Sequence, residues 1–131
     1  MKVSESVSEI LREGRSARDS SGFIPAHDDL GHVERAIQFG FPASYRRFVE
    51  LGGLSELRIR ERPLSLEEIQ LAVSNSTVER FVPFAENGCG DLVGWLRANV
   101  AEPEVVIFDH EEGRLEPYYS CFSAWLAANR F

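Results

Sequence analysis

The hydrophobic positions at the start of the chain recur at helical spacing and then give way to a polar stretch. Apolar residues three or four apart predict an amphipathic helix over residues 3–13. Residues 14–22 have no apolar period and are rich in serine and glycine, so we expect an exposed loop there.

Two further helices are predicted before residue 54. One opens at Asp28-Asp29, whose charges suit the positive end of a helix, and is predicted to stop at Gly40. The other opens at Pro42, where a missing N–H costs nothing, and ends at Gly52-Gly53. Glycine suits that end because it adopts left-handed backbone angles at low cost.

The next segment switches briefly to strand spacing. Over residues 57–62, Leu57, Ile59 and Glu61 alternate with arginines, which predicts a half-exposed strand at a sheet edge. Ser65 followed by Glu68 then has the spacing of a capping box and predicts a short helix that ends near Asn75. The apolar residues of this helix are Leu66, Ile69, Leu71 and Val73.

Three apolar runs follow and predict strands: Phe81–Phe84, Leu92–Leu96 and Val105–Phe108. The second and third runs are continuous rather than alternating, so we expect both faces of these strands to be covered. Glu111-Glu112-Gly113 predicts a hairpin turn, after which residues 115–119 return as a short strand.

The last element is a helix that we expect Ser120 to cap, with Phe122, Trp125 and Leu126 facing inward. Helices, then an antiparallel meander, then one closing helix define an α+β class. The 131 residues are the size of one domain. We therefore predict a single domain over residues 1–131, with a central antiparallel sheet flanked by N-terminal helices and a C-terminal helix.

The stretch Asn87-Gly88-Cys89-Gly90-Asp91 lies between two predicted strands and has three interpretations. A phosphate cradle needs a helix start and usually a lysine, and neither follows Asp91. A nucleophilic Cys89 needs a base and a positive setting, whereas Glu86 and Asp91 are acidic. The sequence favours a hairpin turn in which Gly88 and Gly90 supply unusual backbone angles next to Asp91.

The acidic residues are concentrated in the second half of the chain. Residues 1–62 carry ten acidic and ten basic side chains, whereas residues 63–131 carry eleven acidic side chains and four arginines, which accounts for the whole net charge of −7. Such a charge repels nucleic acid and attracts a basic partner, although it also serves solubility alone. Between residues 98 and 118 Arg114 is the single arginine or lysine. The acidic residues of this segment are Glu102, Glu104, Asp109, Glu111, Glu112 and Glu116.

Candidate chemistry beyond the glycine turn is sparse. His27 and His32 are five residues apart, which does not place them on one helical face, and no cysteine pair has zinc-ligand spacing. Asp109-His110-Glu111-Glu112 is more typical of a solvated turn at a strand end than of an acid/base cluster. We expect no metal, no cofactor and no catalytic residue.

Three further observations set the cellular context that we expect. No apolar stretch reaches the roughly 18 residues of a membrane helix. The first residues are polar and acidic, so no export signal is visible. Two cysteines, Cys89 and Cys121, are too few for a disulfide scaffold. Together these features predict a cytoplasmic protein with free thiols.

The order of motifs resembles the SUKH superfamily, the domain of fungal cell-wall assembly regulators and many bacterial immunity proteins. Residues 41–53, FPASYRRFVELGG, resemble its opening block, and residues 81–91, FVPFAENGCGD, resemble the strand, glycine turn and aspartate of its second block. Residues 105–111 and 120–126 resemble its third block, a strand into Asp-His-Glu followed by a serine-capped aromatic helix. The resemblance covers residues 28–130.

The resemblance implies a non-catalytic binding domain that, in bacteria, binds and neutralises a cognate toxin domain, often a nuclease. A basic toxin surface would suit the acidic residues from Glu102 to Glu116, so these are the expected partner-binding residues. Direct nucleic-acid or membrane binding is not expected. The sequence leaves open which toxin is bound and whether the chain forms a homodimer.

Two other classes of function remain as alternatives. The chain could be a regulatory scaffold that binds an intracellular protein with no toxin partner. It could also be an enzyme that uses Cys89 and His110, although the acidic neighbours of Cys89 disfavour a thiolate.

Overall fold

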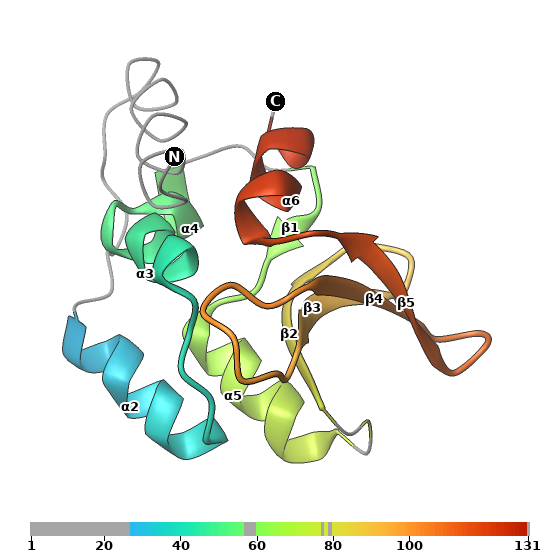
Figure 1. Cartoon of the computed structure of the whole chain (residues 1–131), viewed down its shortest axis with the longest axis horizontal. Coiled ribbons are helices and arrows are strands. Elements are labelled where there is room, and N and C mark those ends of the chain that lie inside the picture. Colours follow the sequence, from blue (N-terminus) through green and yellow to red (C-terminus); the bar gives the residue numbers. More distant parts are fainter. Residues whose placement is uncertain (1–26, 57–59, 77, 79, 131) are drawn as a thin grey trace.

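A five-stranded antiparallel sheet with helices packed against it forms the centre of the molecule (Figure 1). The computed structural model describes residues 27–56, 60–76, 78 and 80–130. The helix predicted over residues 3–13, the loop at 14–22, and Leu57 and Ile59 of the predicted edge strand lie outside the described residues. The elements are α2 (His27–Ile37), α3 (Ala43–Glu50), α4 (Gly53–Glu56), β1 (Arg62–Pro63), α5 (Leu66–Asn75), β2 (Phe81–Glu86), β3 (Leu92–Leu96), β4 (Val105–Asp109), β5 (Arg114–Tyr119) and α6 (Phe122–Asn129).

The strands form a meander in the order β1-β2-β3-β4-β5, and every neighbouring pair is antiparallel. This arrangement confirms the predicted α+β class and the predicted pairing of the strands on either side of the glycine turn. The edge strand β1 is two residues long, Arg62–Pro63, and of the described residues of the predicted strand, Arg60 and Glu61 precede it.

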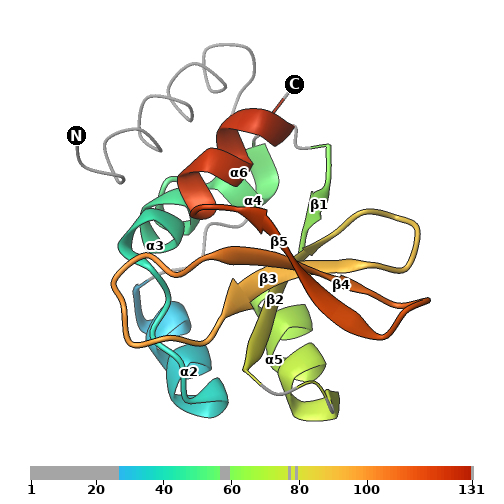
Figure 2. The same ribbon diagram turned by 45° about the vertical axis from the view of Figure 1, so that its right-hand side comes forward.

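The inner face of the sheet carries the hydrophobic core. Val93, Trp95 and Val105 are fully buried there in one cluster with residues of α2, α3, α5 and α6. The centre of the cluster is aromatic: the Trp95 ring lies 4.5 Å from Phe84 and 4.9 Å from Tyr45, measured between centroids. In Figure 2, α6 lies above the strands, α3 to their left, and α2 and α5 below them. The sheet and helices are therefore held together mainly by aromatic burial, worth roughly 1.5–3 kcal/mol per large side chain.

The residues that point away from these helices form the outer face of the sheet. Because paired residues on neighbouring strands share a face, the register fixes its members. Apart from one ion pair, Arg62 with Glu86, they are apolar, which is unusual for a sheet face on which no helix of the described residues packs. The outer face consists of Arg62, Phe81, Pro83, Glu86, Leu92, Gly94, Leu96, Val106, Phe108, Leu115 and Pro117.

The pairing between β2 and β3 contains an irregularity. The pairing shifts register between Pro83 and Ala85, which places Phe84 and Ala85 on the inner face in succession. At Gly94 a Cβ atom would lie 2.2 Å from the Val82 carbonyl oxygen. Only glycine fits a position where neighbouring backbone approaches this closely.

The helix ends follow the predictions in part. Gly52 has φ 84° and ends α3 as predicted, but Gly53 begins α4, and a Cβ there would lie 2.3 Å from the Phe48 ring. The predicted stop at Gly40 is wrong, because α2 ends at Ile37 and Gln38 takes the left-handed backbone with φ 55°. A hydrogen bond of 3.1 Å from the Phe39 N–H to the Glu34 carbonyl closes this end.

The predicted capping box of α5 is confirmed. The Ser65 hydroxyl accepts from the Glu68 N–H at 3.1 Å, and the Glu68 carboxylate accepts from the Ser65 N–H at 2.9 Å. Leu71 does not join the apolar stripe of this helix, since 62% of it is exposed. The predicted Ser120 cap of α6 is wrong: Cys121 occupies the N-cap position, and its side chain makes no capping hydrogen bond.

Candidate functional site

The glycine turn that joins β2 to β3 is organised by the side chain of Asn87. Its Oδ1 accepts hydrogen bonds from the N–H groups of Cys89, at 2.8 Å, and Asp91, at 3.3 Å. Gly88 and Gly90 have φ of 80° and 100°, the left-handed region that other residues adopt at a cost. The turn is therefore a hairpin turn as predicted, with glycines at the positions where the backbone requires them.

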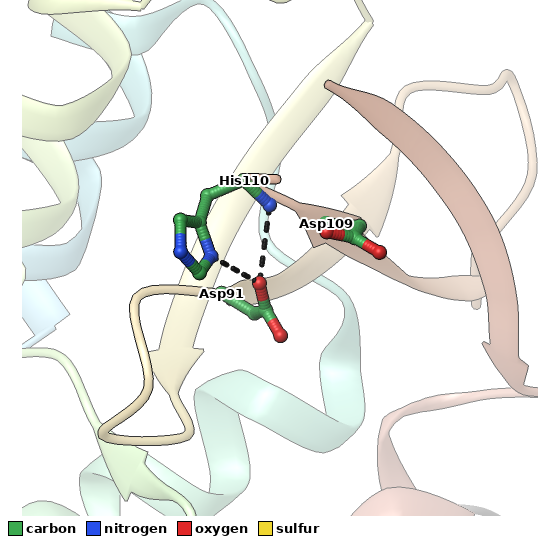
Figure 3. Close-up of side chains that lie close together, drawn as sticks. All are labelled: Asp91, Asp109 and His110. Carbon is green, nitrogen blue, oxygen red and sulfur yellow. Dashed lines mark hydrogen bonds and ion pairs between the residues drawn. The ribbon is translucent and has the colours of Figure 1, made fainter. Parts of the chain in front are cut away.

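The turn between β4 and β5 meets this first turn at the same end of the sheet. His110 donates its backbone N–H to Asp91 Oδ1 at 3.1 Å, and its ring Nδ1 lies 2.6 Å from the same oxygen (Figure 3). A Cβ at Gly90 would lie 2.9 Å from the His110 ring. The imidazole therefore rests against the glycine turn, and Asp91 and His110 fasten the two hairpins together.

The Asp91–His110 contact shifts both titrations. The hydrogen bond from the His110 ring to Asp91, together with the charges of Asp91, Glu111 and Asp109, raises the pKa of His110 above its usual value. Hydrogen bonds from the His110 ring and backbone, and then from Asn87, lower the pKa of Asp91. The pair consequently favours an imidazolium beside a carboxylate.

Asp109 lies across from Asp91 on the neighbouring strand, one step beyond the paired residues Leu92 and Phe108. Two carboxylates so placed repel each other unless donors surround them. Asp109 Oδ1 accepts from the N–H groups of Glu111, at 2.9 Å, and Glu112, at 3.2 Å. These bonds shape the β4–β5 turn and reduce the cost of placing the two carboxylates together.

Asp91, Asp109 and His110 could in principle hold a cation, since their ligand atoms all lie within 4.8 Å of one another. Several of these ligand atoms, however, already take part in hydrogen bonds within the turns. Asp91 Oδ1 accepts from His110, its Oδ2 accepts from Asn87 at 3.0 Å, and Asp109 Oδ1 accepts two backbone N–H groups. The two turns are connected by hydrogen bonds, and these bonds account for the positions of the three side chains.

Cys89 and His110, the residues of the enzyme alternative, both lie in this region. Cys89 is exposed, and its backbone N–H donates to Asn87. His110 directs Nδ1 to Asp91. Among the described residues no hydrogen bond joins the Cys89 thiol to the His110 ring. The arrangement therefore lacks the nucleophile–base contact that activates a cysteine.

The acidic residues predicted to bind a partner divide into two groups. Glu104, Glu111 and Glu112 are exposed and Asp109 is half-buried, at the two ends of β4. The Glu116 carboxylate lies 3.1 Å from Nε of Arg114 in an exposed ion pair.

Glu102, by contrast, is engaged inside the protein. Its two carboxylate oxygens accept hydrogen bonds from the N–H and the hydroxyl of Ser44 in α3. At the other end of the same loop, Arg97 donates to the carbonyls of Ile37 and Gln38 at 2.9 Å each. An anion thus caps the start of one helix and a cation caps the end of another, which suits both helix dipoles.

Sequence reasoning missed the role of Glu61, which is only 8% exposed. It accepts hydrogen bonds from Trp125 Nε1 at 2.8 Å and from the Tyr118 hydroxyl at 3.0 Å. Burial and the bond to Glu61 raise the pKa of Tyr118 well above its usual value. Its partners lie 57 and 64 residues away, so no local spacing signals this contact.

Two surface pockets lie near the glycine turn and near the β3–β4 loop. A pocket of about 150 Å³ lies under the glycine turn and is lined by Glu86, Gly88, Gly90, Asp91 and Leu92. A larger hollow of about 450 Å³ lies between the α2–α3 connection and the loop after Arg97. Both are formed by turns rather than by the core.

The sequence matches the model of one known protein family over most of its length. The model of the SMI1 / KNR4 family (SUKH-1) matches residues 25–128, and the chain belongs to this family. This confirms the resemblance to the SUKH superfamily seen in residues 28–130. No curated protein matches the sequence. Among the described residues, none of the helices has the length and apolar character needed to cross a bilayer.

Proposed function

We propose that the chain is a cytoplasmic, non-catalytic immunity protein that binds and neutralises a cognate toxin domain of the nuclease class. The observation that supports this most is family membership together with the excess of acidic residues between residues 98 and 118. SUKH domains are generally immunity proteins that bind their toxins without chemistry. The partner-binding residues in this proposal are Glu104, Asp109, Glu111, Glu112 and Glu116, with Glu102 supporting the loop between them.

Charge explains why a nuclease is a suitable target. A nuclease must present cations to hold the phosphates of its substrate. An acidic protein can occupy that surface in place of the nucleic acid, and opposite charges speed the encounter. Between residues 98 and 118 there are six acidic residues and one arginine, so the charge of this segment has the required sign.

Rescue of growth tests the proposal. Cells that express a toxin-like protein encoded beside the gene for this chain should survive when the chain is co-expressed, and the two purified proteins should form a complex. Changing Glu104, Glu111 and Glu112 together to lysine should slow association by at least about tenfold at low salt. Glu67→Lys, at an exposed acid of α5, is the matched control and should change the rate little.

Absence of rescue together with absence of a complex contradicts the immunity role. A complex without rescue, formed with a protein that is not a toxin, favours the regulatory scaffold instead. Cys89→Ser separates both from the enzyme alternative, because loss of rescue with normal folding would show that the thiol is needed.

A further inference from the structure

Apart from Arg62 and Glu86, the outer face of the sheet is apolar, whereas a water-facing antiparallel sheet is normally polar. Phe81 and Val106 are each only 3% exposed, and the Phe81 ring centroid lies 6.3 Å from that of Phe108. Leu92, Phe108 and Leu115 are half-buried beside them. In the described part of the chain, the helices pack on the opposite face. The apolar side chains at the centre of the outer face are therefore buried, and those at its margin are partly exposed to water.

Acidic residues stand at both ends of this face. Glu104 is exposed and lies opposite Leu96, whose N–H donates to the Glu104 carbonyl at 3.1 Å. Asp109, Glu111 and Glu112 lie at the other end of β4, in the turn. An apolar centre with a charged rim is the usual anatomy of a protein–protein interface.

The pocket of about 150 Å³ joins this face at its hairpin end, because Leu92 belongs to both. Its volume is several times the roughly 30 Å³ share of one water molecule. Two acidic residues, Glu86 and Asp91, contribute to its lining. Glu86 also forms an exposed ion pair with Arg62, whose Nε lies 3.1 Å from Glu86 Oε1.

We propose that the outer face and this pocket together form the docking surface for a basic partner protein. The partner places a lysine or arginine head in the pocket beside Glu86 and Asp91, and an apolar anchor against Leu92, Phe108 and Leu115. The exposed edge of β5 is a poorer docking site, because Pro117 removes an N–H from the middle of that strand. The inference rests on the proposed function and names the surface through which it acts.

Peptides selected on the full chain test this assignment. A random peptide library displayed on phage is selected against the immobilised protein, and an enriched peptide is synthesised as the probe. We expect enriched peptides to pair lysine or arginine with an aromatic or aliphatic residue. Leu115→Ser should weaken peptide binding by at least about tenfold. Glu86→Gln should weaken binding at low salt, and the difference from the wild type should shrink at high salt because salt screens the charge interaction.

Two matched variants provide the controls. Leu71→Ser removes an exposed leucine, and Glu67→Gln removes an exposed acid, both on α5. Neither should change peptide affinity. Mapping of backbone amide shifts on the wild-type chain avoids dependence on variant folding: the peptide should shift residues of β3, β4 and β5, and leave α2 and α6 unchanged.

Several outcomes would overturn the proposal. These are the absence of any enriched peptide, enrichment of acidic or uncharged peptides, shifts confined to the helices, and a dimer of the chain that Leu115→Ser dissociates. Peptide docking on this face without rescue from a toxin would contradict the proposed function alone. Rescue that Leu115→Ser and Glu86→Gln leave undiminished would contradict the docking surface alone.

Discussion

Glu102 holds Ser44 through two hydrogen bonds across 58 residues of sequence. One carboxylate oxygen accepts from the Ser44 N–H at 3.1 Å, and the other accepts from its hydroxyl at 2.5 Å. Ser44 lies in the first turn of α3, where N–H groups lack partners within the helix. Pro42 at the N-cap provides no side-chain cap, so Glu102 supplies it from the β3–β4 loop.

Glu102→Ala should therefore lower the free energy of unfolding by about 1–2 kcal/mol, the usual worth of a helix cap. Urea denaturation of the variant and the wild type measures the difference. Glu104→Ala is the control, because Glu104 is exposed two residues away and should change stability by less than about 0.5 kcal/mol. Equal effects at the two positions would refute a capping role.

Substitutions at the two glycines of the hairpin turn should differ in cost. Gly90→Val should destabilise the protein by roughly 1–3 kcal/mol, because φ is 100° and a Cβ would meet the His110 ring at 2.9 Å. Gly90→Ala should cost more than Gly88→Ala, since Gly88 has positive φ but no atom within 4 Å of its Cβ position. Thermal melts of the three variants give the order, and an unchanged melt for Gly90→Val would remove the turn interpretation.

The His110–Asp91 contact should make stability depend on pH in two windows. Because the folded pKa of His110 is raised above about 6.5, its contribution is complete below that value and is lost as pH rises through the folded pKa. Because the folded pKa of Asp91 is lowered, its contribution is present above about 3.8 and is lost as pH falls through the folded value.

Titration of the His110 ring by NMR measures the first of these shifts. Asp91→Asn should return the His110 pKa toward its usual value, because Asp91 is the largest cause of the increase. Glu112→Gln, at a residue that does not contribute to the shift, should have a smaller effect. An unaltered titration in Asp91→Asn would contradict the contact.

Glu61→Ala should destabilise the protein by about 1–3 kcal/mol, because it leaves the buried Trp125 Nε1 without an acceptor. Glu61→Gln should cost less, since an amide oxygen can still accept one of the two bonds. Glu67→Ala, at an exposed acid, should change little. Chemical denaturation followed by tryptophan fluorescence compares them, and a neutral Glu61→Ala would count against the network.

Two tyrosines should respond in opposite ways to loss of the hydroxyl. Tyr45 is fully buried and its hydroxyl has no hydrogen-bond partner among the described residues, and burial raises its pKa well above the usual value. Tyr45→Phe should therefore leave stability unchanged or raise it. Tyr118→Phe should lower stability by about 1 kcal/mol, because it loses the bond to Glu61. Denaturation midpoints that move in the same direction would contradict this assignment.

Local signals in the sequence were enough for the meander, for the end of α3 and for both ends of α5. The glycines at 88 and 90 predicted the hairpin because their backbone angles are a local property, and the Ser65–Glu68 box predicted the start of α5 for the same reason. The acidic cluster around Asp109 was also visible as a run of like charges.

Contacts between distant segments could not be predicted from spacing. Glu61 and Glu102 looked like ordinary surface acids, and only the folded chain places them beside Trp125 and Ser44. Gly40 looked like the end of α2, but tertiary packing and the Arg97 bonds to the carbonyls of Ile37 and Gln38 favour an earlier end. Packing thus decided what local propensity left open.

The loop between Arg97 and Glu102 offers a place to divide the protein. Residues 98–101 are exposed, with Val100 at 59%, while both ends of the loop are fastened to helices. A protease that nicks this tip would leave two fragments, one ending after β3 and one beginning before β4, that stay associated through the β3–β4 ladder. If the two fragments are expressed separately, their association can serve as a split reporter. The C-terminal fragment would then supply the acidic β4–β5 hairpin as a separate chain.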